Sequence, residues 1–458
     1  MIAKKIVKPL GVLEKYKELV DKTDTIRALG SVVEVIGNIV LSSGPKVHLG
    51  DLCHIEKIEE EKYVLSEVVG FRNGYVVLSP LENITGVYPG AKVLSMGGPL
   101  KVKLGEQLLG RVLNGIGKPI DDKGSLFTKK TGGMYNDPPN PLERPLIRET
   151  FVTGIKSIDS FLTMGKGQRV GIFSGSGVGK STLMGMIARF SKSDVNVIAL
   201  IGERGREVLE FIENELGEQG LKKSVIIVAS ANDSPMNRVR AAYLATSIAE
   251  YFRDEGKDVL LMMDSLTRLA MAQREVGLGA GEPATTKGYP PSVFSILPEL
   301  IERAGNSRKG SITAVYTVLV EADDLNEPIA DAARGMLDGH IVLSRKLAGK
   351  SHYPAVEIVE SISRSMPFVT EKQHWQKAAK LREYLAEYQE NEEIINLGAY
   401  ISGSNHVLDM AIRLKNEFDK FLNQEIDEVS SFDNTFSVLN EIYQKSQSGR
   451  ESGIRRVR

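Results

Sequence analysis

The spacing of apolar residues divides the chain into four segments. Within the N-terminal segment, residues 1–30, the stretch GVLEKYKELV has apolar positions at helical spacing among charges, which predicts a short amphipathic helix that either docks a partner or lies on its own domain. Over residues 31–95, short apolar runs such as SVVEVIGNIV and GYVVLSP are separated by Gly, Pro, Asn and Ser, which predicts a small β-barrel. The pattern changes again after residue 95 and after residue 366.

Residues 96–366 combine a connector with a long alternating segment. The connector is rich in Gly and Pro, as in GIGKPIDDKG, and is expected to wrap around a domain rather than fold alone. After residue 150, β-branched runs such as RVGIF, VNVIALIG and DVLLMMD alternate with helical patterns, which predicts a parallel sheet with helices on both faces. Over residues 367–458, long helical patterns replace the strands. The predicted fold is therefore α/β, with an N-terminal barrel, a central parallel-sheet domain and a C-terminal helical domain.

The composition excludes several classes of protein. In 458 residues, 58 Lys and Arg balance 59 Asp and Glu, so the surface has no general attraction for a polyanion and no nucleic-acid partner is expected. Cys53 is the only cysteine, which excludes a disulfide framework and favours a reducing cytosol. No uncharged apolar run approaches the roughly 20 residues that span a bilayer, so we expect a cytosolic or peripheral protein.

The segment RVGIFSGSGVGKSTLMGMIARF has the order of strand, glycine-rich loop and helix that a phosphate-binding loop needs. Its glycines allow backbone N–H groups to face an anion, Lys180 can reach the outer phosphates, and the Ser181 hydroxyl can hold Mg²⁺. Ser174 stands where the strict pattern G-x-x-x-x-G-K-[ST] has glycine, so the pattern fails at one position. The context still predicts that a nucleotide is bound by Gly175, Ser176, Gly177, Val178, Gly179, Lys180, Ser181 and Thr182.

Two acidic residues complete the set that a nucleotide hydrolase needs. Asp264 follows five apolar residues in VLLMMDSLTR and is placed to organise the Mg²⁺ ion. Glu203 lies just past the strand VNVIALI, where a base could align the attacking water. An alternative for Glu203 is an acid that merely favours the N-terminus of the next helix. Because the loop and both acids follow parallel strands, we expect all three at one edge of the sheet.

Together, the motifs SGSGVGKST, GERGRE, DSLTRLAMAQRE, SHYPAVEIVESISR and INLGAYISGSN resemble those of the hexameric ATPases of the rotary ATP synthase and type III secretion superfamily. The resemblance covers nearly the whole chain after the first thirty residues, and it implies a RecA-like P-loop domain over residues 96–366. The chain looks most like the flagellum-specific export ATPases, with the injectisome ATPases as near twins. The segment GAYISGSN replaces the acidic rotor-driving segment of F-type β subunits, which disfavours a synthase subunit.

The resemblance assigns roles to the nucleotide-site residues one by one. Lys180 matches the phosphate-binding lysine, and Ser181 matches the Mg²⁺ ligand. Asp264 matches the acid that organises the metal. Glu203 matches the glutamate that activates water, with Arg204 beside it in the nucleotide site. Hydrolysis of Mg-ATP is therefore expected.

Two further residues are implied by the resemblance alone. Tyr353, in SHYPAVE, matches the aromatic residue that packs on the adenine ring, with a core tyrosine as the alternative. Arg364, in ESISR, matches the arginine finger that reaches into the neighbouring subunit's site and supplies roughly 10³ or more in rate. A finger acting in trans implies that the assembled ring is a better catalyst than the isolated subunit.

The family resemblance also implies partners and a location. We expect a homohexamer that uses ATP to release chaperones from export substrates and to help unfold them at export gate membrane proteins. Residues 367–458 would receive chaperone–cargo complexes, a central stalk protein would occupy the ring, and a stator-like regulatory protein would bind residues 1–30. The protein would be cytoplasmic and peripheral at the inner face of the cytoplasmic membrane.

Three alternatives stay open from the sequence. The first is an ATPase of a virulence injectisome, which shares the catalytic core and the GAY segment. The second is an RNA translocase similar to the Rho terminator, although the barrel segment offers few aromatic residues for stacking bases and many acids. The third is a structural ring subunit that binds nucleotide without hydrolysing it, which the complete catalytic set disfavours.

Overall fold

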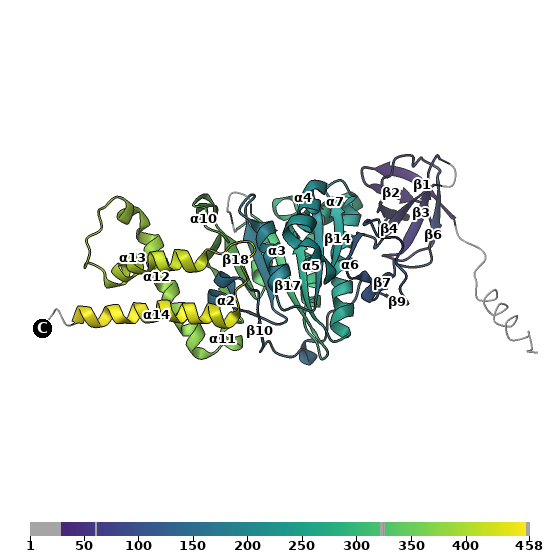
Figure 1. The fold of residues 1–458 in the computed structure, drawn as a ribbon. Helices are drawn as coiled ribbons and strands as arrows, with labels where there is room; N and C mark the ends of the chain where they lie inside the picture. The colour runs from purple at the N-terminus through teal and green to yellow at the C-terminus, as the bar shows by residue number, and fades with distance from the viewer. Residues whose placement is uncertain (1–28, 60–61, 321–323, 325, 455–458) are drawn as a thin grey trace, which may run out of the picture. The chain divides into compact units, whose positions relative to one another are not determined.

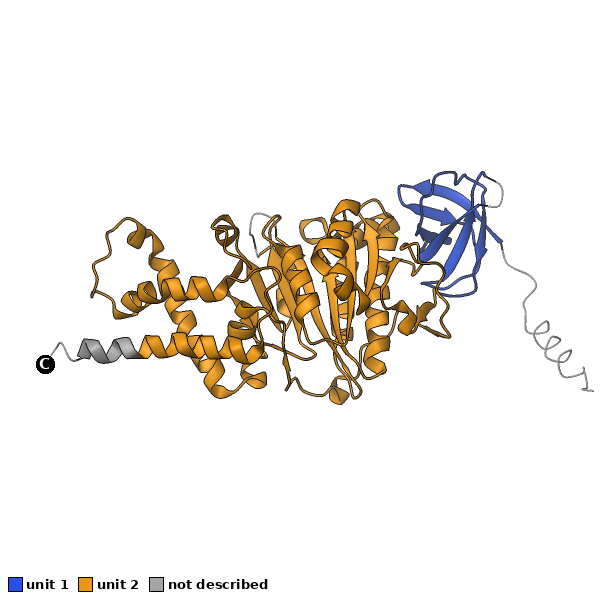
Figure 2. Ribbon diagram, in the orientation of Figure 1, with its two compact units in different colours: residues 1–99 blue, residues 100–458 orange. Residues whose placement is uncertain are grey.

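The computed structural model describes residues 29–59, 62–320, 324 and 326–454 and divides into two compact units, residues 1–99 and 100–458 (Figures 1 and 2). Side chains are described as far as residue 447. The short amphipathic helix predicted at GVLEKYKELV lies outside the described residues, and residues 29 and 30, the last two of the N-terminal segment, begin the first strand. The domain limits at residues 30, 95 and 366 stay predictions.

The first unit is the predicted β-barrel. Its strands close in the order β1-β2-β5-β4-β3-β6, with β1 antiparallel to both β2 and β6. Alternate side chains point inward and form a small core that includes Val40, Ile55 and Leu78. The barrel strands are β1 (Leu29–Ile36), β2 (Ile39–Ser42), β3 (Leu52–Glu56), β4 (Tyr63–Arg72), β5 (Tyr75–Pro80) and β6 (Lys92–Ser95).

The second unit is built on a nine-stranded sheet with the order β19-β18-β12-β17-β15-β13-β14-β8, and β16 pairs with β17 (Figure 1). Pairing is parallel from β18 to β8, as the alternating pattern predicts, whereas β19 runs antiparallel to β18. The strands are β8 (Arg111–Asn114), β12 (Arg169–Ser174), β13 (Val195–Glu203), β14 (Ser224–Ser230), β15 (Asp258–Asp264), β16 (Gly305–Asn306), β17 (Ser311–Leu319), β18 (Gly339–Leu343) and β19 (Val356–Ser363).

Helices cover both faces of this sheet. On one face, α3 buries Leu183 in the same core cluster as Ile172 and Met262, while α6 contacts β13, β14 and β15 from the other face. The helices between strands are α2 (Lys156–Phe161), α3 (Lys180–Phe190), α4 (Gly205–Glu210), the π-helical η3 (Phe211–Leu216), α5 (Gly217–Lys222), α6 (Pro235–Asp254), α7 (Leu266–Ala280), η4 (Thr286–Gly288), α8 (Pro291–Arg303), α9 (Pro328–Met336) and α10 (Arg345–Gly349).

The connector is ordered by a buried ion pair. Arg303, which is 0% exposed, donates to Glu250 at 2.7 Å and to the carbonyl of Met134 at 2.9 Å. Asn136 donates to the same carboxylate at 2.8 Å. A buried charge pair is tolerated because further hydrogen bonds satisfy it, so this network holds the connector against α6 and α8. The connector also contributes β7 (Val102–Leu104), η1 (Glu106–Leu108), β9 (Lys130–Gly132) and η2 (Pro141–Glu143). After it, β10 (Thr150–Phe151) and β11 (Met164–Gly165) form a separate two-stranded sheet.

The C-terminal segment is helical, as predicted, and it packs on the base of the sheet domain. His374 contacts the Ser160 carbonyl at 2.9 Å, and Arg382 donates to the carbonyls of Phe161 at 2.9 Å and Ser361 at 3.0 Å. The contacts with Ser160 and Phe161 satisfy carbonyl groups at the C-terminal end of α2, and the contact with Ser361 ties α12 to β19. The helices are α11 (Met366–Val369), α12 (Lys372–Asn396), α13 (His406–Leu422) and α14 (Phe432–Ile454).

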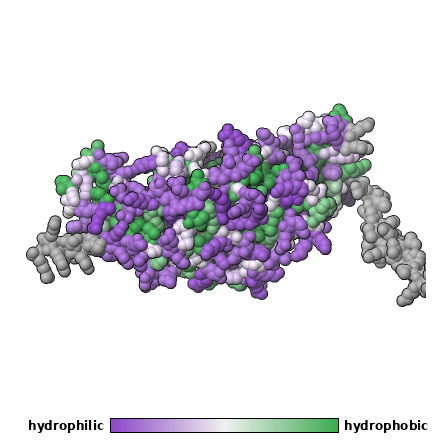
Figure 3. Space-filling view, in the orientation of Figure 1, coloured by the Kyte–Doolittle hydropathy of each residue, from purple (hydrophilic) through white to green (hydrophobic). Residues whose placement is uncertain are grey.

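Among the described residues, no helix is both long and apolar enough to cross a bilayer. Figure 3 shows one face, on which hydrophilic residues predominate and hydrophobic residues form small groups.

Candidate nucleotide site

The predicted phosphate loop joins the end of β12 to the start of α3. Ser174 is the last residue of β12, and α3 begins at Lys180. Gly179 adopts φ 88° directly before the helix, a left-handed conformation that favours glycine. At Gly175, a Cβ atom would lie 2.4 Å from Nη2 of Arg345, so any larger residue there would displace the Arg345 side chain. Because Ser174 belongs to the strand, its departure from the strict loop pattern has no conformational cost.

Lys180 and the two predicted acids meet at the carboxyl ends of parallel strands. Lys180 Nζ lies 2.5 Å from Oδ1 of Asp264, at the end of β15, and 3.8 Å from Oε1 of Glu203, at the end of β13. The Thr317 hydroxyl donates to the same Asp264 oxygen at 2.7 Å, which fixes the carboxylate. The structure therefore brings together three residues that are far apart in sequence, with 84 positions between Lys180 and Asp264.

Glu203 is a buried carboxyl group with a shifted pKa. It is 8% exposed, and burial, a hydrogen bond to Glu207 and the negative charge of Asp264 raise its pKa to about 7, against the opposing effects of Lys180 and Arg268. The same hydrogen bond lowers the pKa of Glu207. A carboxyl group that gains and loses a proton near neutrality is suited to general-base chemistry.

Two residues of this cluster are absent from the sequence prediction. Glu207 lies in the first turn of α4, and Arg268 Nε lies 3.3 Å from the Glu203 carboxylate in the first turn of α7. Each follows a strand that ends in a predicted acid. The sequence feature that could have predicted both residues is a charge four positions after the acid, because the first helical turn brings that charge back toward the sheet edge.

The remaining predicted residues occupy different parts of the site. The Ser181 side chain is exposed beside Lys180, whereas the Thr182 hydroxyl donates to Glu215 of η3 at 2.9 Å. Arg204 lies at the N-terminus of α4 with its side chain 80% exposed, and its Nη1 is 3.6 Å from Glu207. The loop itself consists of Gly175, Ser176, Gly177, Val178 and Gly179.

Tyr353 lies against the phosphate loop. It follows α10, and a Cβ atom at Gly179 would be 3.4 Å from its ring. The ring is 42% exposed, so one part of it is free to meet a ligand. Its backbone is held by the C-terminal domain, because Asn423 accepts from its N–H at 3.2 Å and Gln424 donates to its carbonyl at 2.8 Å.

Arg364 lies at the opposite edge of the sheet from the phosphate loop of its own chain. At the loop edge, Leu343 of β18 is in register with Ser174 of β12, whereas Gly339, at the other end of β18, pairs with Ser363 of β19. Arg364 is exposed and follows Ser363 directly. The intervening strand length is about 15 Å, so the structure does not bring Arg364 to the site formed by Lys180 and the acids.

Three family models match the chain. They describe the beta-barrel domain of the ATP synthase alpha/beta family over residues 32–97, the nucleotide-binding domain of that family over residues 154–363, and the T3SS EscN ATPase C-terminal domain over residues 370–441. The matches run from the barrel, through the site, into the C-terminal helices.

Relatives match over nearly their full length. A flagellum-specific ATP synthase of Bacillus subtilis is 51% identical over 92% of this chain and 97% of its own. A type 3 secretion system ATPase of Xanthomonas euvesicatoria is 47% identical over 91% of this chain and 94% of its own. The assembled ATPase EscN of the enteropathogenic E. coli type III secretion system superposes with a TM-score of 0.86 at 44% identity, covering 90% of this chain and all of that one. The chain therefore belongs to the ATP synthase alpha/beta family, among its flagellum-specific and type III secretion ATPases.

Proposed function

We propose that this ATPase is the Mg-ATP-driven motor of a flagellar type III protein export apparatus, which releases chaperones from export substrates and helps to unfold them. The observation that carries the proposal is the convergence of Lys180, Glu203 and Asp264 at one sheet edge. The 51% identity to one flagellum-specific relative supports the flagellar alternative, while other flagellum-specific relatives match at 47%, as the injectisome relative does.

In this proposal, each site residue acts on Mg-ATP. Lys180 binds the outer phosphates, Glu203 activates the attacking water, Arg204 contributes from the rim, and the Tyr353 ring packs on adenine. The Ser181 hydroxyl and the Asp264 carboxylate would hold Mg²⁺, since both present hard oxygen donors beside Lys180. Across the described ranges, no group of three or more His, Cys, Asp or Glu could hold a metal ion alone. Mg²⁺ fits such a site because it takes most of its other ligands from phosphate and water.

The position of Arg364 supports a homohexamer. Because Arg364 is held at the far edge of its own sheet, it can complete a nucleotide site only in another subunit. Head-to-tail contacts of this kind form a ring when the rotation between subunits closes. EscN has been solved in assembled form and in complex with its central stalk EscO, at TM-scores of 0.86 and 0.83 to this chain. We extend both properties, a ring and a central stalk protein, to this chain.

The other proposed partners follow the domain order. The C-terminal helices would receive chaperone–cargo complexes, residues 1–30 would bind a stator-like regulatory protein, and the ring would face export gate membrane proteins from the cytoplasmic side of the inner membrane. No nucleic acid is part of this proposal.

The test of the motor is cargo release. A chaperone–cargo pair carrying two fluorophores is mixed with the assembled protein, and we expect separation of the pair with Mg-ATP but not with ADP or without nucleotide. A chaperone from an unrelated secretion route is the control and should keep its cargo. Hydrolysis of ATP without release of the cognate cargo would contradict the motor role.

The elevated pKa of Glu203 predicts a pH dependence of hydrolysis. The free enzyme should show a kcat/KM for ATP that rises with pH through a midpoint near 7, because the base works only after losing its proton. Replacing Glu207 by Gln removes a negative charge that favours protonated Glu203, so the midpoint should move to lower pH. Steady-state kinetics in buffers of constant ionic strength measure both values, and identical midpoints in the two proteins would contradict the assignment.

A further inference from the structure

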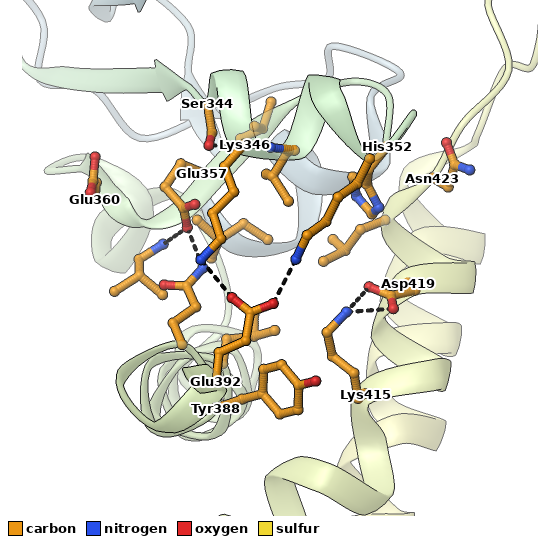
Figure 4. Close-up of a pocket in the computed structure, with 18 of the residues that line it drawn as sticks. Ser344, Lys346, His352, Glu357, Glu360, Tyr388, Glu392, Lys415, Asp419 and Asn423 are labelled. Atoms are coloured by element: carbon orange, nitrogen blue, oxygen red, sulfur yellow. Dashed lines mark hydrogen bonds and ion pairs between the residues drawn. The ribbon is translucent and has the colours of Figure 1, made fainter. Parts of the chain in front are cut away.

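A cavity of about 480 Å³ lies between the sheet domain and the C-terminal helices, at the seam where α10 and β19 meet α12 and α13 (Figure 4). Its apolar lining comes from both sides of the seam. Some of its polar residues pair across the opening, and others, such as Lys415 and Asp419, pair within one helix. The aliphatic lining residues are Leu347, Val356, Ile358, Val359, Leu385 and Leu422.

Glu392 of α12 binds two cations across this seam, Lys346 of α10 and Lys350, which directly follows α10 (Figure 4). Lys350 Nζ donates to Oε1 of Glu392 at 2.6 Å, and Lys346 Nζ lies 2.6 Å from Oε2. The Glu392 side chain is only 12% exposed, whereas both lysines are more than half exposed. Ion pairs from two cations to one shielded carboxylate stabilise the contact more than an isolated pair on the surface does.

The helix α10, which carries Lys346 and ends just before Lys350, also borders the phosphate loop. α10 has only five residues and follows β18, whose last residue, Leu343, is in register with Ser174. The first residue of α10, Arg345, lies so close to Gly175 that a Cβ atom there would be 2.6 Å from its Nε. Lys346 and Gly175 also line a common cavity of about 200 Å³. A shift of α10 therefore moves groups that border the loop.

We propose that Glu392 is a positioning residue for nucleotide binding: by holding Lys346 and Lys350, it keeps α10 and Arg345 against the phosphate loop. Glu392 touches no part of the loop itself and acts only through α10. Other contacts keep α12 attached when this clamp is removed, such as the Gln389 bond to Glu357 at 2.7 Å. The clamp thus makes the affinity of the loop for nucleotide depend on the C-terminal domain.

The test compares Glu392→Gln with wild type in the full chain, with Mg-ATP as the probe. KM should rise about fivefold, corresponding to roughly 1 kcal/mol, while kcat changes less than twofold, because only nucleotide binding is weakened. The matched control is Glu383→Gln, which removes a glutamate of the same helix that pairs with Lys380 within the helix. Its KM should equal that of wild type.

Reversal of the charges separates positioning from general destabilisation. The triple variant Lys346→Glu, Lys350→Glu and Glu392→Lys restores attraction across the seam and should return KM to within twofold of wild type. If Glu392→Gln does not fold, Lys346→Ala with Lys350→Ala replaces it, since both lysines are largely exposed. An unchanged KM in the clamp variants, an equal rise in Glu383→Gln, or no recovery on reversal would overturn the proposal.

The proposal rests on nucleotide binding by the loop, which belongs to the proposed function, but it does not depend on the export role. Wild-type KM is measured without chaperone or cargo. Failure of cargo release would therefore leave the KM comparison intact, and an unchanged KM would leave cargo release untouched.

Discussion

Replacement of Glu203 by Gln should lower the kcat of ATP hydrolysis by about 10² to 10⁴ while nucleotide still binds. The amide has nearly the same size and keeps a hydrogen-bond acceptor, but it cannot take the proton of the attacking water. Lys180 and Asp264 remain paired at 2.5 Å, so the phosphate-binding part of the site is unchanged. Phosphate release measured at saturating Mg-ATP, together with binding of a fluorescent ATP analogue, separates the two effects.

Glu210→Gln is the matched control for this substitution. Glu210 ends α4, where its carboxylate accepts from Arg206 at 2.8 Å on the exposed side of the helix. Its loss should leave kcat within twofold of wild type. Retention of most hydrolysis by Glu203→Gln would show that another group serves as the base.

Replacement of Arg364 by Ala should reduce hydrolysis by about 10³ or more, because a guanidinium that contacts the transferring phosphate stabilises charge in the transition state. The substitution should leave folding unchanged, since the side chain is exposed and its backbone N–H keeps its bond to Asp338 at 3.0 Å. Arg308→Ala, at another largely exposed arginine, is the control and should retain activity.

Mixing variants tests whether the arginine acts in trans. Lys180→Ala subunits lack a working phosphate loop but supply Arg364, and Arg364→Ala subunits have the opposite defect. Each should be inactive alone, and hydrolysis should return when the two are mixed and assembled. A chain that carries both substitutions should rescue nothing when it is mixed with Arg364→Ala. Rescue by this double variant, or full activity of Arg364→Ala alone, would contradict action in trans.

Some features of the fold follow directly from local pattern. The barrel and the parallel sheet were predictable because their strands are short apolar runs bounded by turn residues. The segment REVLEFIENEL also predicts a helix, but α4 passes into the π-helical η3 before Gly217, which has φ 65°. Apolar spacing does not distinguish the two helix types, because the wider turn is set by packing against α3.

The candidate site was predictable where a residue follows a strand or sits in the loop. Lys180, Glu203 and Asp264 meet because parallel strands end at one edge. Arg345 and Glu392 have no such signal, since their importance depends on how a five-residue helix packs between the loop and the C-terminal domain. Contacts between segments so distant in sequence are set by tertiary packing and leave no local periodicity.

The antiparallel direction of β19 has a consequence for the stoichiometry of active sites. Because β19 carries its final residues to the edge opposite the phosphate loop, each subunit would accept a finger on one side and donate one on the other. An open row of subunits would then always hold one site without a finger, at its end. Closing the row into a ring completes that last site, so closure itself would raise turnover without any change of shape within a subunit.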